Sequence, residues 1–420
     1  MRRGLALGFV VFSFVVLSLA FGAAECSGDE DGGVYATCRV FIQTDDGSYL
    51  ETFGFGNTVR KIIEDACYYE GFDIEYEALP GSPAGSPDRI KSINGLEATE
   101  PGTNWNIHQW MPLGTHDWGE MGFDRDSNSY IVENAAYCVH ISGRTMVNNV
   151  NVYTKPDFKP VSEAYIYVRF SELTHDLPSD DIQMAFTAED RINGFWMKGR
   201  GSTIAEALVD AAESYNFQLW LIYTIDGNGN DLQGWVDTFF GIGDVNLGTS
   251  NDWAYWSQYM YIDDVWSYNQ WTMGYYDPGV YRFFALVYIE SYGFSMYGDD
   301  GSTEGDTIDS LPDVWDEDYI ASLVKRSEFN VTFKLDGAVH KTITVNYNHV
   351  LETGEIPRPE APEGYYFSGW GDLTARITDD TVFEGRMLEF RPTVTYLDED
   401  GSMLHRETVA YGAPAAYGGV

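Results

Sequence analysis

The sequence predicts an α+β protein built from tandem domains, in each of which a mixed sheet packs on one helix, followed by small mostly-β repeat modules. Three observations predict this class. The chain has 420 residues, which is too long for a single core of ordinary size. Its 43 glycines and 29 tyrosines favour β-rich, turn-rich structure. Two parts of the chain also repeat, which indicates modules rather than one large domain.

The first repeat centres on a helix. The segment GNTVRKIIEDACYYEGF at 56–72 recurs as GSTIAEALVDAAESYNF at 201–217. Both segments place apolar residues at i, i+3, i+4, i+7 and i+8, which is the pattern of an amphipathic helix with one buried face. The buried positions are Val59, Ile62, Ile63, Ala66 and Cys67 in the first copy and Ile204, Ala207, Leu208, Ala211 and Ala212 in the second. Thr203 and Glu206 also predict a capping box at the second helix start.

Strand patterns flank each predicted helix. The alternating segments TCRVFIQ at 37–43 and YIYVRF at 165–170 precede the helices, and AAYCVHIS and YRFFALVYIES close the two units. A comparison without gaps places Trp105 on Trp253 and Trp118 on Trp266. The order strand, helix, Gly-turn strand, Trp strand and final strand predicts a β-grasp-like domain in both copies.

These patterns also set the expected domain limits. The first domain is predicted at 34–153 and the second at 161–292, joined by a linker at 154–160 that contains two prolines. An acidic linker is predicted at 293–326, with a short helix near its end.

A different β module follows the acidic linker. The segment VTFKLDGAVHKTITVNY at 331–347 predicts two alternating strands around a turn and leads to GYYFSGW, so we expect a compact module at 327–389. VTYLDEDGSMLHRETVAYG at 394–412 repeats its beginning, which predicts an incomplete second copy at 390–420. Because half a repeat cannot bury its own face, we expect the sequence to be truncated at its C-terminus.

The N-terminus carries an export signal. Residues 1–24 contain MRR followed by the uncharged stretch GLALGFVVFSFVVLSLAFGAA, which predicts a signal peptide or, if it is not cleaved, a membrane anchor. An acidic linker is expected at 25–33. The formal net charge of −40 excludes nucleic acids as partners, because phosphate backbones need clustered Lys and Arg. Because of the export signal, we expect a secreted or cell-surface protein.

Four cysteines in an exported chain permit one or two disulfides. Cys38 and Cys138 lie on strands that could be neighbours, so they are a candidate pair. The repeat places Ile166, Ala212 and Leu286 at the positions of Cys38, Cys67 and Cys138. We therefore expect inward-facing side chains and no thiol nucleophile.

Two family resemblances emerge from these motifs. The first two units resemble the transcobalamin C-terminal-like domain, a β-grasp-type module of exported proteins, through the helix, the turn SINGLEA at 92–98 and the Trp strand after it. The third region and its partial copy resemble the internalin-type B-repeat, also called the Listeria–Bacteroides repeat, through VTFKLDGAVHKTITV and GYYFSGW. These resemblances imply a prokaryotic surface protein that serves in adhesion or display.

Tryptophans are the candidate ligand-binding residues. They either cover a sheet face as part of the core or line an aromatic cleft for a flat ligand such as a saccharide. The resemblance to transcobalamin-type domains adds a corrinoid as a ligand to consider. The candidates are Trp105, Trp110, Trp118, Trp253, Trp256 and Trp266.

Metal binding is not predicted. His108, His116, Asp117 and Glu120 lie close together in sequence and are of the types that bind zinc. However, the comparison without gaps puts Trp256 and Asp264 at the histidine positions, so a solvated loop is the better prediction. The loop DGNGNDLQG at 226–234 has Asp231 where a calcium loop needs glycine, and we expect a hairpin connection there.

The sequence predicts no enzyme and no cofactor, since it contains no nucleophile elbow, phosphate-binding loop, metalloprotease motif or dinucleotide fingerprint. Asn330 begins a glycosylation sequon. The leading hypothesis is a non-catalytic surface protein for adhesion, display or protein-protein contact, with a protein or glycan at a cell surface as partner. The alternative is a surface receptor for a corrinoid or saccharide. The oligomeric state stays open.

Overall fold

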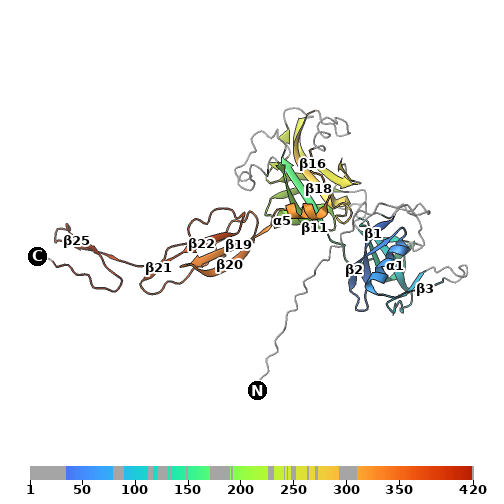
Figure 1. Ribbon diagram of the computed structural model, residues 1–420, viewed down its shortest axis with the longest axis horizontal. Helices are drawn as coiled ribbons and strands as arrows, with labels where there is room; N and C mark the ends of the chain where they lie inside the picture. Colours follow the sequence, from blue (N-terminus) through green and yellow to red (C-terminus); the bar gives the residue numbers. More distant parts are fainter. Residues whose placement is uncertain are drawn as a thin grey trace, which may run out of the picture.

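Strands predominate among the described residues, and the helices found there are few and short. The computed structural model describes residues 35–78, 89–111, 117–121, 131, 134–147, 150–170, 190, 193–225, 231–240, 242–243, 245–246, 252–262, 264–269, 273–292 and 310–418. Figure 1 shows two units in which helix lies against strands, and a chain of small sheets that extends away from the second unit. Within these residues, no helix is both long and apolar enough to cross a membrane.

The first unit contains a mixed sheet in the order β2-β1-β8-β6-β7, with β9 paired to β8, and a smaller sheet in the order β3-β4-β5. The pair β1 and β8 is parallel, and the other pairs are antiparallel. Its elements are β1 (Ala36–Gln43), β2 (Tyr49–Gly56), α1 (Val59–Glu70), β3 (Ile74–Glu77), β4 (Arg89–Ile93), β5 (Leu96–Glu97), β6 (Thr103–Met111), β7 (Asp117–Met121), β8 (Ala136–Val147) and β9 (Val150–Tyr153).

The second unit repeats this arrangement. Its larger sheet has the order β11-β10-β18-β16-β15, with β17 paired to β16 and with β10 parallel to β18, and its smaller sheet has the order β12-β13-β14. Its elements are β10 (Ser162–Phe170), β11 (Phe195–Gly201), α5 (Ile204–Ser214), β12 (Leu219–Ile225), β13 (Asp231–Phe239), β14 (Ile242–Gly243), β15 (Val245–Asn246), β16 (Asp252–Ile262), β17 (Val265–Tyr268), the 3-10 turn η2 (Met273–Tyr275) and β18 (Phe283–Tyr292).

Both predicted helices are confirmed, together with their buried faces. Thr58 and Thr203 cap them by accepting hydrogen bonds from the backbone N–H groups of Lys61 and Glu206. The Glu206 carboxylate does not close the capping box on Thr203. It accepts a hydrogen bond from the backbone N–H of Ser202 instead, at 2.8 Å.

Each helix lies directly on an edge strand because that strand carries two glycines. A Cβ atom at Gly54 would lie 1.9 Å from the carbonyl oxygen of Ile62, and one at Gly199 would lie 1.9 Å from that of Ala207. The glycines therefore let the two backbones approach more closely than any side chain would permit. They also fix the correspondence between the units, because Gly54 and Gly199 hold the same place.

The strand pairing, counted from Gly54 and Gly199, shows which residues of the two units correspond. It corrects the alignment of the two units without gaps. Gly54 pairs with Cys38 and Gly199 with Ala164, so Cys38 corresponds to Ala164 and not to Ile166. The same ladders place Trp105 level with Trp256 and not with Trp253. Trp118 and Trp266 do correspond, as the sequence predicted.

The third region begins with the short helix α7 (Glu317–Leu323) and continues as small sheets in the orders β20-β19-β22, β21-β23 and β24-β25. The two strands predicted around the turn at 335–338 are confirmed, and β19 also pairs in parallel with β22. The remaining elements are β19 (Glu328–Leu335), β20 (Ala338–Asn346), β21 (Tyr365–Phe367), β22 (Thr381–Gly385), β23 (Met387–Glu389), β24 (Thr393–Leu397) and β25 (Met403–Thr408).

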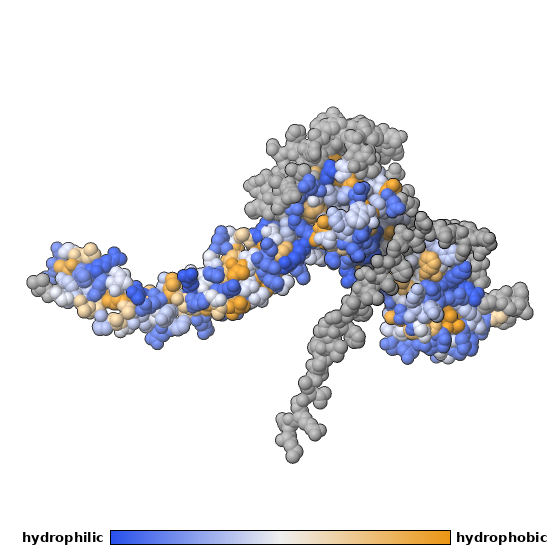
Figure 2. All heavy atoms as spheres, viewed as in Figure 1, coloured by the Kyte–Doolittle hydropathy of each residue, from blue (hydrophilic) through white to orange (hydrophobic). Residues whose placement is uncertain are grey.

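The surface of this third region mixes hydrophobic and hydrophilic residues. Figure 2 shows both kinds side by side along the small sheets. Val339, Val382 and Met403 are among the apolar side chains that stay exposed there. Such small modules have too little interior to bury all of their apolar residues.

Gly54→Ala is expected to destabilise the first unit by about 1–3 kcal/mol or more, because the new methyl group overlaps the backbone of α1. Hydrogen exchange of the α1 amides measures the loss. Gly354→Ala is the matched control, since a Cβ atom there meets nothing within 4 Å. Equal exchange rates in the two variants would contradict the close helix contact.

Candidate functional site

Trp105 and Trp256 lie in the core between helix and sheet. Both are buried, and each donates its indole N–H to a backbone carbonyl of the preceding hairpin: Trp105 to Leu96 at 3.1 Å and Trp256 to Ile242 at 2.9 Å. Burying a tryptophan with its N–H satisfied stabilises the core and leaves no ring face open. These two residues therefore fasten the smaller sheet to the larger one.

Trp110 and Trp118 cover the sheet face opposite α1. They pair across β6 and β7 with their ring centroids 5.6 Å apart and their planes at 68°, in an edge-to-face arrangement. Trp118 donates its N–H to the carbonyl of Phe158 at 2.7 Å, and Trp110 donates to the carbonyl of Ser202 at 3.3 Å. The first acceptor lies in the segment that leaves the unit, and the second lies in the next unit.

The second unit uses the same device. Trp266 donates its N–H to the carbonyl of Pro312 at 2.8 Å, in the segment that leaves this unit. Leu311, Val314 and Ile320 of that segment are buried with Trp266 on the sheet face opposite α5. Each exit segment is therefore bound across the sheet by the tryptophan of β7 or β17.

The described tryptophan side chains do not form the open ligand site that the sequence made a candidate. Trp105, Trp110, Trp118, Trp256 and Trp266 are all buried. Trp253 lies on β16, and its side chain is outside the described residues. The rings that the sequence offered for a flat ligand instead close each unit and join it to the next part of the chain.

Arg39 connects the first two units. Its guanidinium is nearly buried and binds the carboxylate of Glu51 at 2.8 Å within its own unit. It also donates to the hydroxyl of Ser162 and, at 3.1 Å, to the carbonyl of Val161 at the start of the second unit. Nearby, burial raises the pKa of Asp277 to about 6, against the N–H of Gly279 and the charge of Arg39, which both lower it.

A buried histidine pair lies on the same face as Trp110 and Trp118. His108 Nδ1 and His140 Nε2 are 3.2 Å apart, and both side chains are almost fully buried. Burial lowers the pKa of each histidine to about 4. At His140, the neighbouring His108 lowers the pKa further. The tyrosine hydroxyl of Tyr49 lies 3.4 Å from His140 Nδ1.

The histidines do not form the metal cluster that the sequence made worth considering. His108 contacts His140 rather than Asp117, and the carboxylate of Asp117 binds Lys155 at 2.6 Å. His116 lies outside the described residues. Among the residues that are described, no three His, Cys, Asp or Glu side chains come together in a way that could hold a metal ion.

The candidate disulfide between Cys38 and Cys138 is wrong. Both thiols are free and buried, and they lie on opposite faces of the sheet: Cys38 packs beneath α1, whereas Cys138 packs with Trp110 and Trp118. Burial also raises the pKa of the Cys67 thiol to about 12 and raises that of Cys138. Strand pairing places Ala164 and Ala285 at the positions of Cys38 and Cys138, and the matching helices place Ala212 at that of Cys67, so the cysteines act as small core residues.

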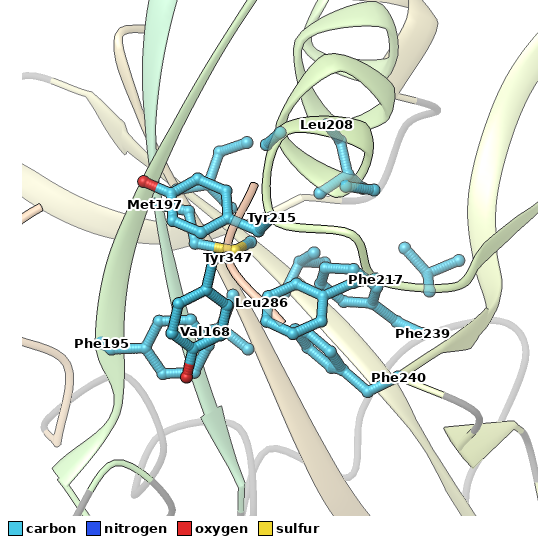
Figure 3. Packing of buried hydrophobic residues seen from close by; sticks show 14 of the residues in the cluster. Val168, Phe195, Met197, Leu208, Tyr215, Phe217, Phe239, Phe240, Leu286 and Tyr347 are labelled. Atoms are coloured by element: carbon cyan, nitrogen blue, oxygen red, sulfur yellow. The ribbon is translucent and has the colours of Figure 1, made fainter. Parts of the chain in front are cut away.

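A third junction joins the second unit to the module that contains β19, β20 and β22. The hydroxyl of Tyr215 donates to the carbonyl of Lys325, and the ring of Tyr347 packs 5.8 Å from that of Phe217. Figure 3 shows Tyr347 among the residues of the second unit's core. The backbone N–H of Lys325 donates to the carbonyl of Trp196 on β11 at 2.8 Å.

An open groove of about 570 Å³ lies along this junction, where Asn330 is among its lining residues. Its cations are all paired: Lys198 with Glu163, Lys325 with Asp190 and Arg326 with Asp380. The groove therefore offers little free charge to an anionic ligand. Asn330 is exposed on β19, and its glycosylation stays a prediction.

The structure also bears on the loop predicted at 226–234. The hairpin predicted around 226–234 is present, because β12 and β13 pair antiparallel, but residues 231–234 belong to β13 and residues 226–230 lie outside the described part of the chain. Sequence reasoning missed the acceptors of the indole N–H groups, Phe158, Ser202 and Pro312, since a backbone carbonyl has no sequence signature. The one signal in the sequence was Phe158 itself, a large aromatic residue in a segment that was predicted to be a linker.

Neither the known protein families nor the curated proteins contain a match to this chain.

Trp118→Phe and Trp266→Phe are expected to free the exit segments while keeping an aromatic ring in the core. Each variant loses one hydrogen bond and leaves a carbonyl without its donor, which costs about 1–3 kcal/mol. Limited proteolysis should cut faster at 154–160 in the first variant and at 310–316 in the second. Cleavage that is unchanged at both sites would contradict the role of the indoles.

The histidine pair predicts acid sensitivity of the first unit. Because each folded-state pKa is lowered from 6.5, the stability that the neutral rings provide is complete above about pH 6.5 and is lost as the pH falls towards 4. Between about pH 7 and pH 5, each histidine should cost about 2 kcal/mol of unfolding free energy. Asp277 acts in the opposite direction below about pH 6, because its pKa is raised.

Substitution with the residues of the second unit provides the control for this pH effect. Strand pairing places Tyr259 and Val287 at the positions of His108 and His140. The double variant His108→Tyr, His140→Val should lose most of the acid sensitivity in urea unfolding curves recorded across this pH range. A variant that is as acid-sensitive as the natural chain would show that other groups cause the effect.

Proposed function

We propose that this chain is an exported, non-catalytic cell-surface protein whose joined modules display the N-terminal units for contact with another protein. The single observation that carries this proposal is the use of the tryptophans. Trp110, Trp118 and Trp266 bind the chain that leaves their own unit or the unit that comes after it, and all three rings are buried. Side chains that hold modules together suit a supporting arm better than a pocket.

The contacts at the junctions support an arm of limited flexibility. Arg39 bridges the first two units, and Tyr215 and Tyr347 join the second unit to the module after it. Inter-domain contacts that bury aromatic rings and a paired charge restrict the motion that a simple linker would allow. Figure 1 is consistent with this interpretation, since the small sheets extend from the second unit in a line.

The finer fold assignments belong to the same proposal. A helix on a mixed sheet with a parallel central pair supports a β-grasp-like, transcobalamin C-terminal-like domain in each of the first two units. The order β20-β19-β22, with its parallel pair, supports a B-repeat-like module after them. Modules of the latter kind suit spacers, because they are small and succeed each other along the chain.

The receptor hypothesis, with a corrinoid or saccharide as ligand, requires open tryptophan rings on the first two units. The described rings among its candidates are buried. No observation therefore favours it over display and protein contact.

Export is the part of this proposal that a cell experiment tests. The full chain with a C-terminal epitope tag is expressed in a bacterial host, next to a variant without residues 4–24. We expect the tag of the full chain outside the cytoplasm, where protease added to intact cells or to the culture medium removes it, and the tag of the variant inside. A full chain that stays in the cytoplasm with a protected tag would overturn the proposal.

A further inference from the structure

The two repeated units differ at one edge of their larger sheets. β2 and β11 are the edge strands that carry the helix-facing glycines, and Glu51, Phe53 and Phe55 of β2 hold the places of Trp196, Lys198 and Arg200 of β11. In an antiparallel ladder, alternate residues turn their N–H and C=O groups away from the neighbouring strand. These residues therefore line the open side of each edge.

The edge of β11 is occupied by the chain itself. Val324 forms a parallel bridge with Trp196, and the N–H of Lys325 donates to the carbonyl of Trp196 at 2.8 Å. The Lys325 ammonium then binds the carboxylate of Asp190 at 2.9 Å. The segment thus binds as an added strand, with an apolar residue at the bridge and a lysine directly after it.

One of the outward groups is satisfied in the same way in both units. The N–H of Phe55 donates to the carboxylate of Asp65, and the N–H of Arg200 donates to that of Asp210, each at 2.8 Å. This shared contact confirms that the two edges are oriented alike. It leaves the first half of each strand as the part where another strand can pair.

The edge of β2 is open where β11 is covered. Within the described part of the chain, no strand pairs with the outer side of β2. Phe53 and Phe55 are 52% and 53% exposed, although both are large and apolar. An open edge with exposed aromatic side chains favours pairing with another extended chain, and proteins normally protect such edges.

We propose that the β2 edge binds an extended segment of another protein, which runs parallel to β2 and has an apolar residue followed by a lysine. The segment at 324–325 provides the pattern, since it occupies this position on the second unit. Charge supports the basic residue: Asp45 and Asp46, both exposed, lie in the turn before β2, just as Asp190, which binds Lys325, precedes β11 in the sequence. The inference rests on the proposed display function and names the class of partner.

The probe for this site is a fluorescent peptide with the sequence of residues 319–329, YIASLVKRSEF. Titrated against the full chain, it is expected to bind and to slow hydrogen exchange at the amides of Glu51 and Phe53. A peptide N-methylated at its lysine cannot make the main-chain bond and should bind at least tenfold more weakly. Equal binding of the methylated peptide would show adhesion to aromatic rings without strand addition and would overturn the proposal.

A matched pair of variants locates the binding. Phe53→Thr with Phe55→Thr removes the exposed rings from β2, and we expect at least a tenfold loss of peptide affinity. Trp220→Thr with Ile222→Thr does the same on β12, another edge strand with exposed apolar residues, and should change nothing. Threonine suits strands, so both variants are expected to fold, and hydrogen exchange of α1 and α5 verifies this.

Several outcomes would count against the β2 site. These are no binding of the peptide, protection that appears outside β2, or self-association of the full chain that depends on Phe53 and Phe55 without peptide binding. The last result would identify a second copy as the occupant. Because the measurement uses purified protein, its failure leaves the export experiment unaffected.

Discussion

The hydrogen bond from an indole N–H to the chain that leaves the unit is the interaction on which this modular architecture depends. Trp118 and Trp266 come from corresponding strands and bind the carbonyls of Phe158 and Pro312. A sheet that carries a helix on one face must cover its other face. Here the cover is the connecting chain itself, so closing one unit also fixes where the next begins. The connections that the sequence predicted to be linkers are therefore part of the fold where the structure describes them.

In this arrangement, a tryptophan ring that is covered by the exit segment cannot also bind a ligand. A large aromatic ring on a sheet face serves either as an open platform or as a buried anchor, and burying it contributes several kcal/mol that an exposed ring does not. In both units the exit segment covers the ring, and in the first unit Trp110 and Arg39 extend the contact to the second unit. The same surface cannot also receive a flat ligand without separating the modules.

The sequence was sufficient for local structure and insufficient for the register between copies. The buried stripe of each helix and the small residues beneath it follow from periodicity, because one packed face imposes one pattern. A comparison without gaps failed beyond the helix, since the hairpins before Trp105 and Trp256 and after Trp110 and Tyr261 differ in length. It matched Trp105 with Trp253, three residues from the true partner. In a strand, an odd shift moves a side chain to the other face of the sheet. The disulfide hypothesis failed for the same reason: Cys38 and Cys138 lie on adjacent strands but on opposite faces.

Duplication gives the chain two copies of one scaffold whose surfaces are free to differ. The constraints that build the scaffold are the same in both copies: glycines beneath the helix, a capping threonine, and a carboxylate that binds one outward N–H of the edge strand. The edges are not under that constraint. In the second copy the exit segment continues past the sheet face to reach β11, because the next module begins there. In the first copy the exit segment leads instead to the second unit, and β2 receives no strand from it. The β2 edge, which keeps two exposed phenylalanines, is thus the place where the described fold still has pairing capacity.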